Sequence, residues 1–169
     1  ERLYLAQEIM QKNIDIAVNK LYKNPRIAEW RLWHGKDFNP ASTVQLRSLL
    51  FDTMGLKPTG KKTGTGAIST DAEVLRELSV QSEVPGLILD LRQRSKIKNT
   101  YLDKIIPQLD RDGRLRTNFN LHSTTSGRLS SSGKLNMQQL PRDNPSVKGC
   151  IRAGWGKRIV AMDLTTAEV

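Results

Sequence analysis

The spacing of apolar residues changes once along the chain, near Asp110, and this change limits the folds that the chain can adopt. Before it, apolar residues recur among charged ones as they do in amphipathic helices. After it, residues 115–121 alternate between apolar and polar side chains, the two-residue period of a half-buried strand. The sequence therefore predicts an α+β protein, in which a helical part of residues 1–109 precedes a strand-containing part of residues 110–169.

Helix starts and stops in the first part are unusually clear. Capping-box patterns at Ser42–Gln45 and Thr70–Glu73 each begin a helix, because a hydroxyl and the side chain three residues later can satisfy free backbone donors. Proline and glycine mark the other ends. The predicted helices are Glu1–Lys23, ending at Asn24-Pro25; about 43–54; about 71–79; and one that follows Pro85-Gly86 and ends near Ile106, before Pro107.

Two connections between these helices are expected to be irregular. Residues 24–41 contain Trp30 and Trp33 together with Gly and Pro, and packing of these indoles is favoured over a cofactor or base-stacking role. Residues 57–66 are rich in Gly, Thr and Lys and predict a mobile, basic loop. The loop lacks the glycine spacing and the preceding strand of a P-loop, so contact with a nucleic-acid backbone is the function considered for it.

Positive charge is concentrated in the second half of the chain. Residues 1–90 contain 12 Lys/Arg and 11 Asp/Glu, whereas residues 91–169 contain 15 and 6. Such a field attracts polyanions, of which nucleic acid is the commonest. Charge alone leaves ribosomal, membrane-surface and solubility roles open.

Other features exclude several classes of protein. No stretch approaches the roughly 20 apolar residues that span a bilayer, and no signal peptide is visible, so we expect an intracellular protein without a membrane partner. Cys150 is the only cysteine, which rules out an internal disulfide, and no histidine cluster accompanies it to form a zinc site.

Two motifs carry the chemistry. The first is Thr124–Ser132, followed by Leu135–Pro141; the second is Val160–Val169, in which an apolar strand predicted at Arg158–Asp163 ends in a carboxylate. In this order they resemble the family A DNA polymerase runs T-x-T-G-R-L-S-S, P-N-L-Q-N-I-P and D-Y-S-Q-I-E-L. The resemblance begins at residue 42, with the S-T-x-Q-L helix start, the basic loop and an I-L-x-x-R-x-x-x-K-x-K helix.

The resemblance implies a fold and a reaction. Residues 1–109 would be a helical thumb with a long helical hairpin, and residues 110–169 would begin a palm with the first antiparallel strands of its sheet. Members of this family are DNA-directed DNA polymerases. In their reaction a primer 3′-hydroxyl attacks the α-phosphate of a deoxynucleotide, and two Mg²⁺ ions bind the attacking and leaving oxygens. The second carboxylate and the cationic helix of that site do not occur after Asp163 here, so we expect no activity without a complementary part.

The same resemblance implies partners and a location. The expected partners are primer–template DNA, deoxynucleoside triphosphates, and a complementary C-terminal portion with the fingers and the rest of the palm. The expected location is the cytoplasm of a bacterium or of a virus-infected host, or an organelle matrix.

Individual site residues follow from the matched motifs. Asp163 resembles the first metal-binding, catalytic aspartate, Glu168 the glutamate that packs beside the incoming sugar, and Leu164 stands in the nucleotide pocket. Arg128 resembles the arginine that reaches the minor groove, where every base pair presents acceptors in similar places. The other expected DNA contacts are Thr124, Ser126, Asn136, Gln138, Lys61, Lys62, Lys96 and Lys98.

Departures from the family pattern predict a divergent branch, viral or organellar. Leu164 replaces an aromatic residue, Thr165–Ala167 replaces S-Q-I, and Gly133–Leu135 adds a residue before the Asn-Met-Gln segment.

Two other functions stay open. One is a duplex-DNA-binding module that has lost catalysis; the other is a single-subunit RNA polymerase, against which Glu168 argues because a ribose needs a smaller residue there.

Overall fold

The computed structural model describes residues 1–132, 136–141 and 144–162. The chain divides into two compact units, Gln7–Thr100 and a second that combines Glu1–Ala6 with Tyr101–Val169. The first unit is helical and the second contains the strands, so the predicted α+β class is confirmed. The subdomain boundary between residues 109 and 110 stays a prediction.

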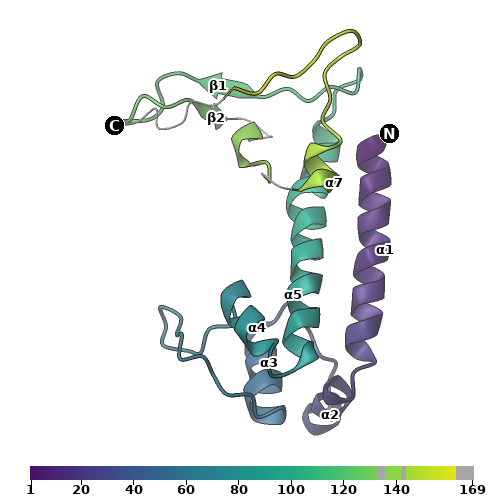
Figure 1. Cartoon of the computed structure of the whole chain (residues 1–169), viewed down its shortest axis with the longest axis vertical. Coiled ribbons are helices and arrows are strands. Elements are labelled where there is room, and N and C mark those ends of the chain that lie inside the picture. Colours follow the sequence, from purple (N-terminus) through teal and green to yellow (C-terminus); the bar gives the residue numbers. More distant parts are fainter. Residues whose placement is uncertain (133–135, 142–143, 163–169) are drawn as a thin grey trace. The chain divides into compact units, whose positions relative to one another are not determined.

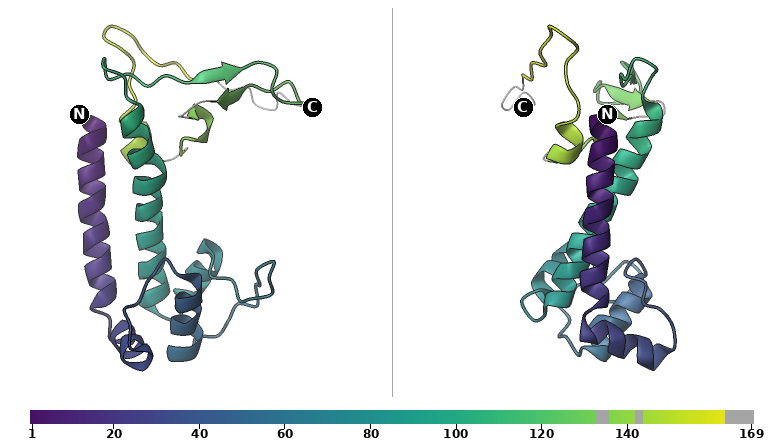
Figure 2. Two further views of the ribbon diagram at one scale, coloured as in Figure 1. Left: turned by 180° about the vertical axis from the view of Figure 1, so that it is seen from behind. Right: turned by 90° about the vertical axis from the view of Figure 1, so that its right-hand side faces the viewer.

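A helical hairpin runs through the unit Gln7–Thr100. There, the part of α1 (Arg2–Tyr22) from residue 7 onward lies beside α5 (Glu83–Lys96) and runs in the opposite direction, as Figures 1 and 2 show. The shorter helices are α2 (Pro25–His34), α3 (Thr43–Arg47), the π-helical η1 (Ser48–Thr53) and α4 (Ala72–Leu78). After α5 the chain continues through the π-helical η2 (Ile97–Leu102), α6 (Asp103–Ile105) and the 3₁₀-helix η3 (Ile106–Gln108). Of the described helices, none is long and apolar enough to cross a membrane.

One apolar core holds the helices α1 to α5 together. Isolated helices as short as α2, α3 and α4 are marginal in water, so burial of their apolar faces has to stabilise them. Each of α1 to α5 contributes at least one buried side chain to the core. Its buried members are Ala17, Leu21, Ile27, Trp30, Phe38, Leu46, Leu49, Leu50, Val74, Leu75, Leu78, Val84, Ile88 and Leu91.

The start of the segment 24–41 is a helix, α2, and the prediction of an irregular connection was wrong there. The side-chain oxygen of Asn24 accepts a hydrogen bond from the Arg26 N–H at 3.0 Å, and Pro25 takes a first-turn position where its missing N–H costs nothing. Gly35 ends the helix in a left-handed conformation with φ of 59°. The pair Asn24-Pro25 therefore ends α1 and begins α2, and the prediction used only the first of these signals.

Helix starts elsewhere differ in detail from the prediction. Asp71, rather than Thr70, caps α4, because its Oδ1 accepts from the Val74 N–H at 3.0 Å. α5 begins at Glu83 with Ser82 as its cap, so that Pro85 and Gly86 lie inside its first turn instead of before it. Proline is tolerated there because the first-turn N–H groups have no intrahelical acceptor.

The strands form one small antiparallel pair. In it, β1 (Asn118–Asn120) pairs with β2 (Ser130–Ser132), with Phe119 opposite Ser131. The strand predicted at residues 115–121 is thus present but shorter. The strand predicted at 158–163 is wrong for residues 158–162, which have no regular secondary structure and whose Ile159, Val160 and Met162 are exposed. A strand needs a paired backbone and a buried face, and the described residues provide neither for this segment.

Two tryptophans of α2 lie in opposite environments. Trp30 is fully buried; its Nε1 donates to the Ser48 hydroxyl at 3.1 Å, and its ring stacks on His34 with centroids 4.1 Å apart. Trp33 is 80% exposed. Packing, the role that the sequence favoured, therefore applies to Trp30.

We predict that Trp30→Ala lowers the free energy of unfolding by about 3–5 kcal/mol, because it leaves a large cavity in the core. The matched control is Trp33→Ala in the same helix, which should change it by no more than about 0.5 kcal/mol. Urea denaturation followed by circular dichroism measures both. Equal losses in the two variants would contradict the described core.

Candidate nucleic-acid interface

The turn that presents Arg128 joins β1 to β2. The Thr124 hydroxyl donates to the Arg128 carbonyl at 2.6 Å, and the Gly127 N–H donates to the Thr124 carbonyl at 3.3 Å. Gly127 has φ of 69°, a conformation that glycine adopts without strain. Ser126 and Arg128 are exposed residues. Three of the predicted DNA-contacting residues therefore share one hydrogen-bonded turn.

Asn136 and Gln138 come from the second part of the motif and lie next to this turn. The Asn136 Oδ1 accepts from the Gln138 N–H at 3.0 Å and so caps the 3₁₀-helix η4 (Met137–Gln139). The Gln138 Nε2 donates to the carbonyl of Leu129 at 2.8 Å. Because Leu129 directly follows Arg128, this bond ties the two halves of the motif together.

Hydroxyl groups stabilise the short sheet beside the turn. The Thr117 and Ser131 hydroxyls lie 2.8 Å apart, and the Ser132 hydroxyl donates to the Asn120 Oδ1 at 3.3 Å. Cross-strand pairs of this kind contribute a few tenths of a kcal/mol to about 1 kcal/mol each. The serines of the motif thus help to hold the strand that follows Arg128.

The four predicted lysines lie in the other unit, two in the basic loop and one each in α5 and η2. Lys96 is exposed at the end of α5, and Lys98 is partly exposed in η2. The arginines four residues before them make contacts within the protein: Arg94 pairs with Asp90 at 2.8 Å, and Arg92 donates from Nη1 to the Thr70 carbonyl at 2.6 Å. Burial lowers the pKa of Arg92. The α5 arginines are therefore engaged structurally.

Backbone hydrogen bonds close the basic loop into a short hairpin. The Ser69 N–H donates to the Lys61 carbonyl at 2.9 Å, and the Thr63 N–H donates to the Ala67 carbonyl at 2.8 Å. Between these two bonds, Lys62 pairs with Ile68 as an antiparallel bridge. The sequence predicted the loop and its positive charge. It did not predict the backbone pairing, because the Gly and Thr residues of the loop are typical of irregular segments.

Two carboxylates hold the ammonium group of Lys61. Its Nζ lies 2.9 Å from the Asp71 Oδ2 and 2.5 Å from the Glu73 Oε2. The Val74 N–H first, and Lys61 second, lower the pKa of the Asp71 carboxyl from 3.8 to about 2. Hydrogen bonds to Glu73 and then Asp71 raise the pKa of Lys61 in turn. Lys62 is exposed on the same hairpin.

The residues expected to handle metal and nucleotide are Asp163, Leu164 and Glu168, and all three lie outside the described residues. Within the described part of the chain, no group of three or more His, Cys, Asp or Glu side chains could hold a metal ion. Mg²⁺ takes six oxygen ligands in octahedral geometry, so one aspartate needs further ligands from elsewhere. The roles of these three residues stay predictions.

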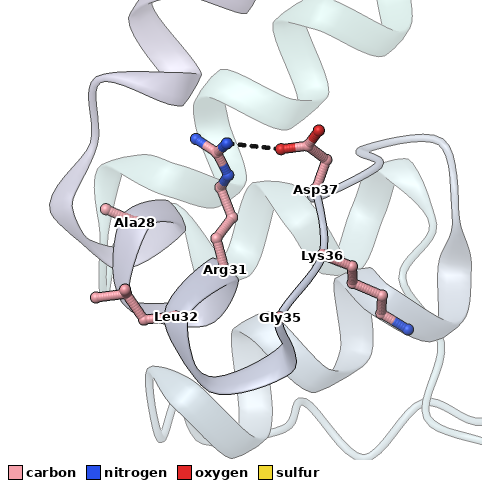
Figure 3. Close-up of a pocket in the computed structure, with 6 residues that line it drawn as sticks. All are labelled: Ala28, Arg31, Leu32, Gly35, Lys36 and Asp37. Carbon is pink, nitrogen blue, oxygen red and sulfur yellow. Dashed lines mark ion pairs between the residues drawn. The ribbon is translucent and has the colours of Figure 1, made fainter.

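A surface hollow of about 550 Å³ adjoins the C-terminal end of α2. Ala28 and Leu32 form an apolar wall, and an ion pair of 2.6 Å between the Arg31 Nη2 and the Asp37 Oδ1 lies across from it, drawn as a dashed line in Figure 3. The hollow contains none of the predicted site residues. Sequence reasoning could have found the helix that lines this hollow from its two ends, Asn24-Pro25 and Gly35.

A sequence model of DNA polymerase family A matches residues 8–169. The chain belongs to DNA polymerase family A. Within family A, it is 52% identical over 169 residues to the DNA polymerase of Escherichia phage T5, which covers 100% of this chain and 20% of the phage protein. It is 40% identical over 142 residues to the thermostable DNA polymerase I of Thermus aquaticus, covering 80% of this chain and 17% of that protein.

A solved polymerase domain has a similar fold. The POL domain of Pol1 from M. smegmatis, in complex with DNA primer-template and dNTP, aligns with a TM-score of 0.72 at 29% identity, over 92% of this chain and 26% of that chain. The family resemblance predicted from the motifs is therefore confirmed. The chain spans about a fifth of the length of the phage T5 polymerase.

We predict that Gly127→Ala makes the amides of β1 and β2 exchange hydrogen about tenfold faster, because the left-handed conformation at residue 127 costs an L-residue roughly 1–2 kcal/mol. Gly64→Ala is the matched control: residue 64 has no positive φ and has open space around it, so exchange should not change. Hydrogen exchange followed by NMR measures both. Unchanged exchange in Gly127→Ala would show that the turn does not support the sheet.

Proposed function

We propose that the chain supplies the thumb, residues 1–109, and the start of the palm, residues 110–169, of a DNA-directed DNA polymerase. The observation that carries this proposal is the hydrogen-bonded group formed by the turn Thr124–Arg128 and the cap Asn136–Gln138, in a chain that belongs to family A. The similar M. smegmatis domain was solved with primer-template and dNTP, which supports duplex DNA as the ligand.

Duplex binding would use two kinds of contact. Arg128, an exposed residue, would donate from its guanidinium to minor-groove acceptors, which every base pair presents in similar places, so that any sequence can be held. Asn136 and Gln138 shape this surface, because their side chains already bond the backbone beside it. Lysines such as Lys62 and Lys96 face phosphates, which position DNA without reading its sequence.

Catalysis would begin from Asp163. We infer that its carboxylate binds Mg²⁺, and that Glu168 and Leu164 border the incoming nucleotide. Two Mg²⁺ ions, when bound, neutralise charge on the attacking and leaving oxygens. The remaining ligands and the cations that hold the triphosphate would come from a complementary C-terminal portion, without which the chain is inactive. The named relatives are phage and bacterial proteins, which favours a bacterial or phage-infected cell as the place of action.

We predict that Arg128→Ala weakens binding of duplex DNA about tenfold or more and to a similar extent for different sequences, because a charged donor to the minor groove is lost. Arg26→Ala removes the same charge from an exposed arginine that pairs with Glu29 at 2.8 Å in the helical unit, and it should have little effect. Fluorescence anisotropy at fixed salt measures both. Equal losses of affinity in the two variants would show that Arg128 contributes only its positive charge and no specific contact.

We predict that Asp163→Ala abolishes primer extension when the chain is combined with its complementary C-terminal portion, primer–template, Mg²⁺ and deoxynucleotides. Asp37→Ala removes an exposed carboxylate of the helical unit and should leave extension unchanged. Gel analysis of the extended primer is the measurement. Extension that survives Asp163→Ala would end the catalytic assignment, and duplex binding without any extension by the unsubstituted protein would favour a non-catalytic binding module.

A further inference from the structure

The base of the basic hairpin is fixed to the helical core. Ser69, the last residue of the hairpin, and Thr70, which follows it, are each only 6% exposed. From α5, Arg92 donates to the Thr70 carbonyl at 2.6 Å. The position of the hairpin's returning strand is therefore set by the core and by α5.

Lys61 connects the hairpin's first strand to the start of α4. Its carbonyl accepts from the Ser69 N–H at 2.9 Å, and its ammonium group reaches both Asp71 and Glu73. Asp71 has two tasks, because its Oδ1 caps α4 through the Val74 N–H while its Oδ2 meets the Lys61 Nζ. One lysine thus joins both strands of the hairpin to the capped end of a core helix.

This arrangement is unsuited to a direct phosphate contact by Lys61. To bind a phosphate, the ammonium group would have to leave two carboxylates at 2.9 and 2.5 Å. If it stayed between them, the phosphate would approach two negative charges, which repel it. The adjacent Lys62 is also exposed, and among the described residues no carboxylate forms an ion pair with it.

We propose that Lys61 is a positioning residue, which latches the hairpin of residues 61–69 to the start of α4 so that Lys62 meets the sugar–phosphate backbone of duplex DNA from a defined position. This proposal rests on the duplex-binding function proposed above. It assigns different tasks to two neighbouring lysines that the sequence alone treats as equivalent.

The latch itself is tested without DNA. In Lys61→Met, the amides of Thr63 and Ser69 should exchange at least about fivefold faster, and the pKa of the Asp71 carboxyl should rise from about 2 toward its ordinary value. Lys61→Arg keeps the charge and should restore both values to those of the unsubstituted chain. Unchanged exchange and an unchanged Asp71 pKa in Lys61→Met would overturn the latch.

Acid should also release the latch. The pKa of Asp71 is lowered in the folded chain, so its contribution to stability is complete above the unfolded value of 3.8 and is lost as the pH falls toward about 2. Exchange of the Ser69 amide, corrected for its intrinsic pH dependence, should therefore accelerate in that range in the unsubstituted chain. In Lys61→Met this acceleration should be smaller.

Duplex binding separates a latch from a phosphate contact. If Lys61 positions the hairpin, Glu73→Gln should weaken binding of a duplex, and Lys61→Met should weaken it by a similar factor of about three to ten. Lys61→Arg should bind like the unsubstituted chain. If Lys61 binds phosphate, Glu73→Gln should instead tighten binding, because it removes a negative charge and releases the lysine; that result would overturn the proposal.

The salt dependence of binding is a second readout. Loss of one phosphate contact lowers the slope of log K against log[salt] by about 0.9. Lys62→Met should show this loss, whereas Lys61→Met should keep most of the slope. The reverse pattern would overturn the proposal. Failure of the unsubstituted chain to bind any duplex would count against the proposed function, and it is distinguishable because the exchange and pKa measurements use no DNA.

Discussion

Burial of a shared apolar core is the interaction on which the helical unit depends. Helices as short as α3 and α4 are not stable alone, because forming the first turn costs more than its hydrogen bonds return. Trp30 and Phe38, both fully buried, bring the segment after α1 into that core. α5, which contributes Ile88 and Leu91 to that core, holds the base of the basic hairpin through the bond from Arg92 to the Thr70 carbonyl. A surface feature proposed to meet DNA is thus positioned by hydrophobic packing beneath it.

Directed hydrogen bonds take over this positioning in the strand-containing unit. The turn at Thr124–Arg128 is closed by a hydroxyl and a backbone amide, and Gln138 ties the neighbouring 3₁₀-helix to Leu129. Hydrogen bonds specify geometry more narrowly than apolar contacts do, since they weaken steeply with angle. Such bonds suit a surface that has to present exposed donors without burying them.

Local signals in the sequence predicted much of the fold. The elements that were missed depend on contacts between residues far apart in the sequence. Ser42 caps α3 as its pattern indicated, with the Gln45 N–H at 3.4 Å. α2 was missed because Asn24-Pro25 has two readings, and the second depends on the packing of Trp30 into the core. The apolar run at residues 158–162 suggested a strand, but strand formation depends on a partner that no local pattern supplies.

The sequence by itself determined the family and the candidate DNA-contacting motif, because both reside in the order and spacing of residues along the chain. Tertiary structure alone decided which tryptophan is buried, that Gln138 bonds Leu129, and that Lys61, rather than the neighbouring Lys62, faces two carboxylates. The physical reason is that the partners of a side chain lie within a few ångströms in space but many residues away in sequence. Neighbouring lysines with the same chemistry can therefore have different tasks, set by what the fold places opposite each.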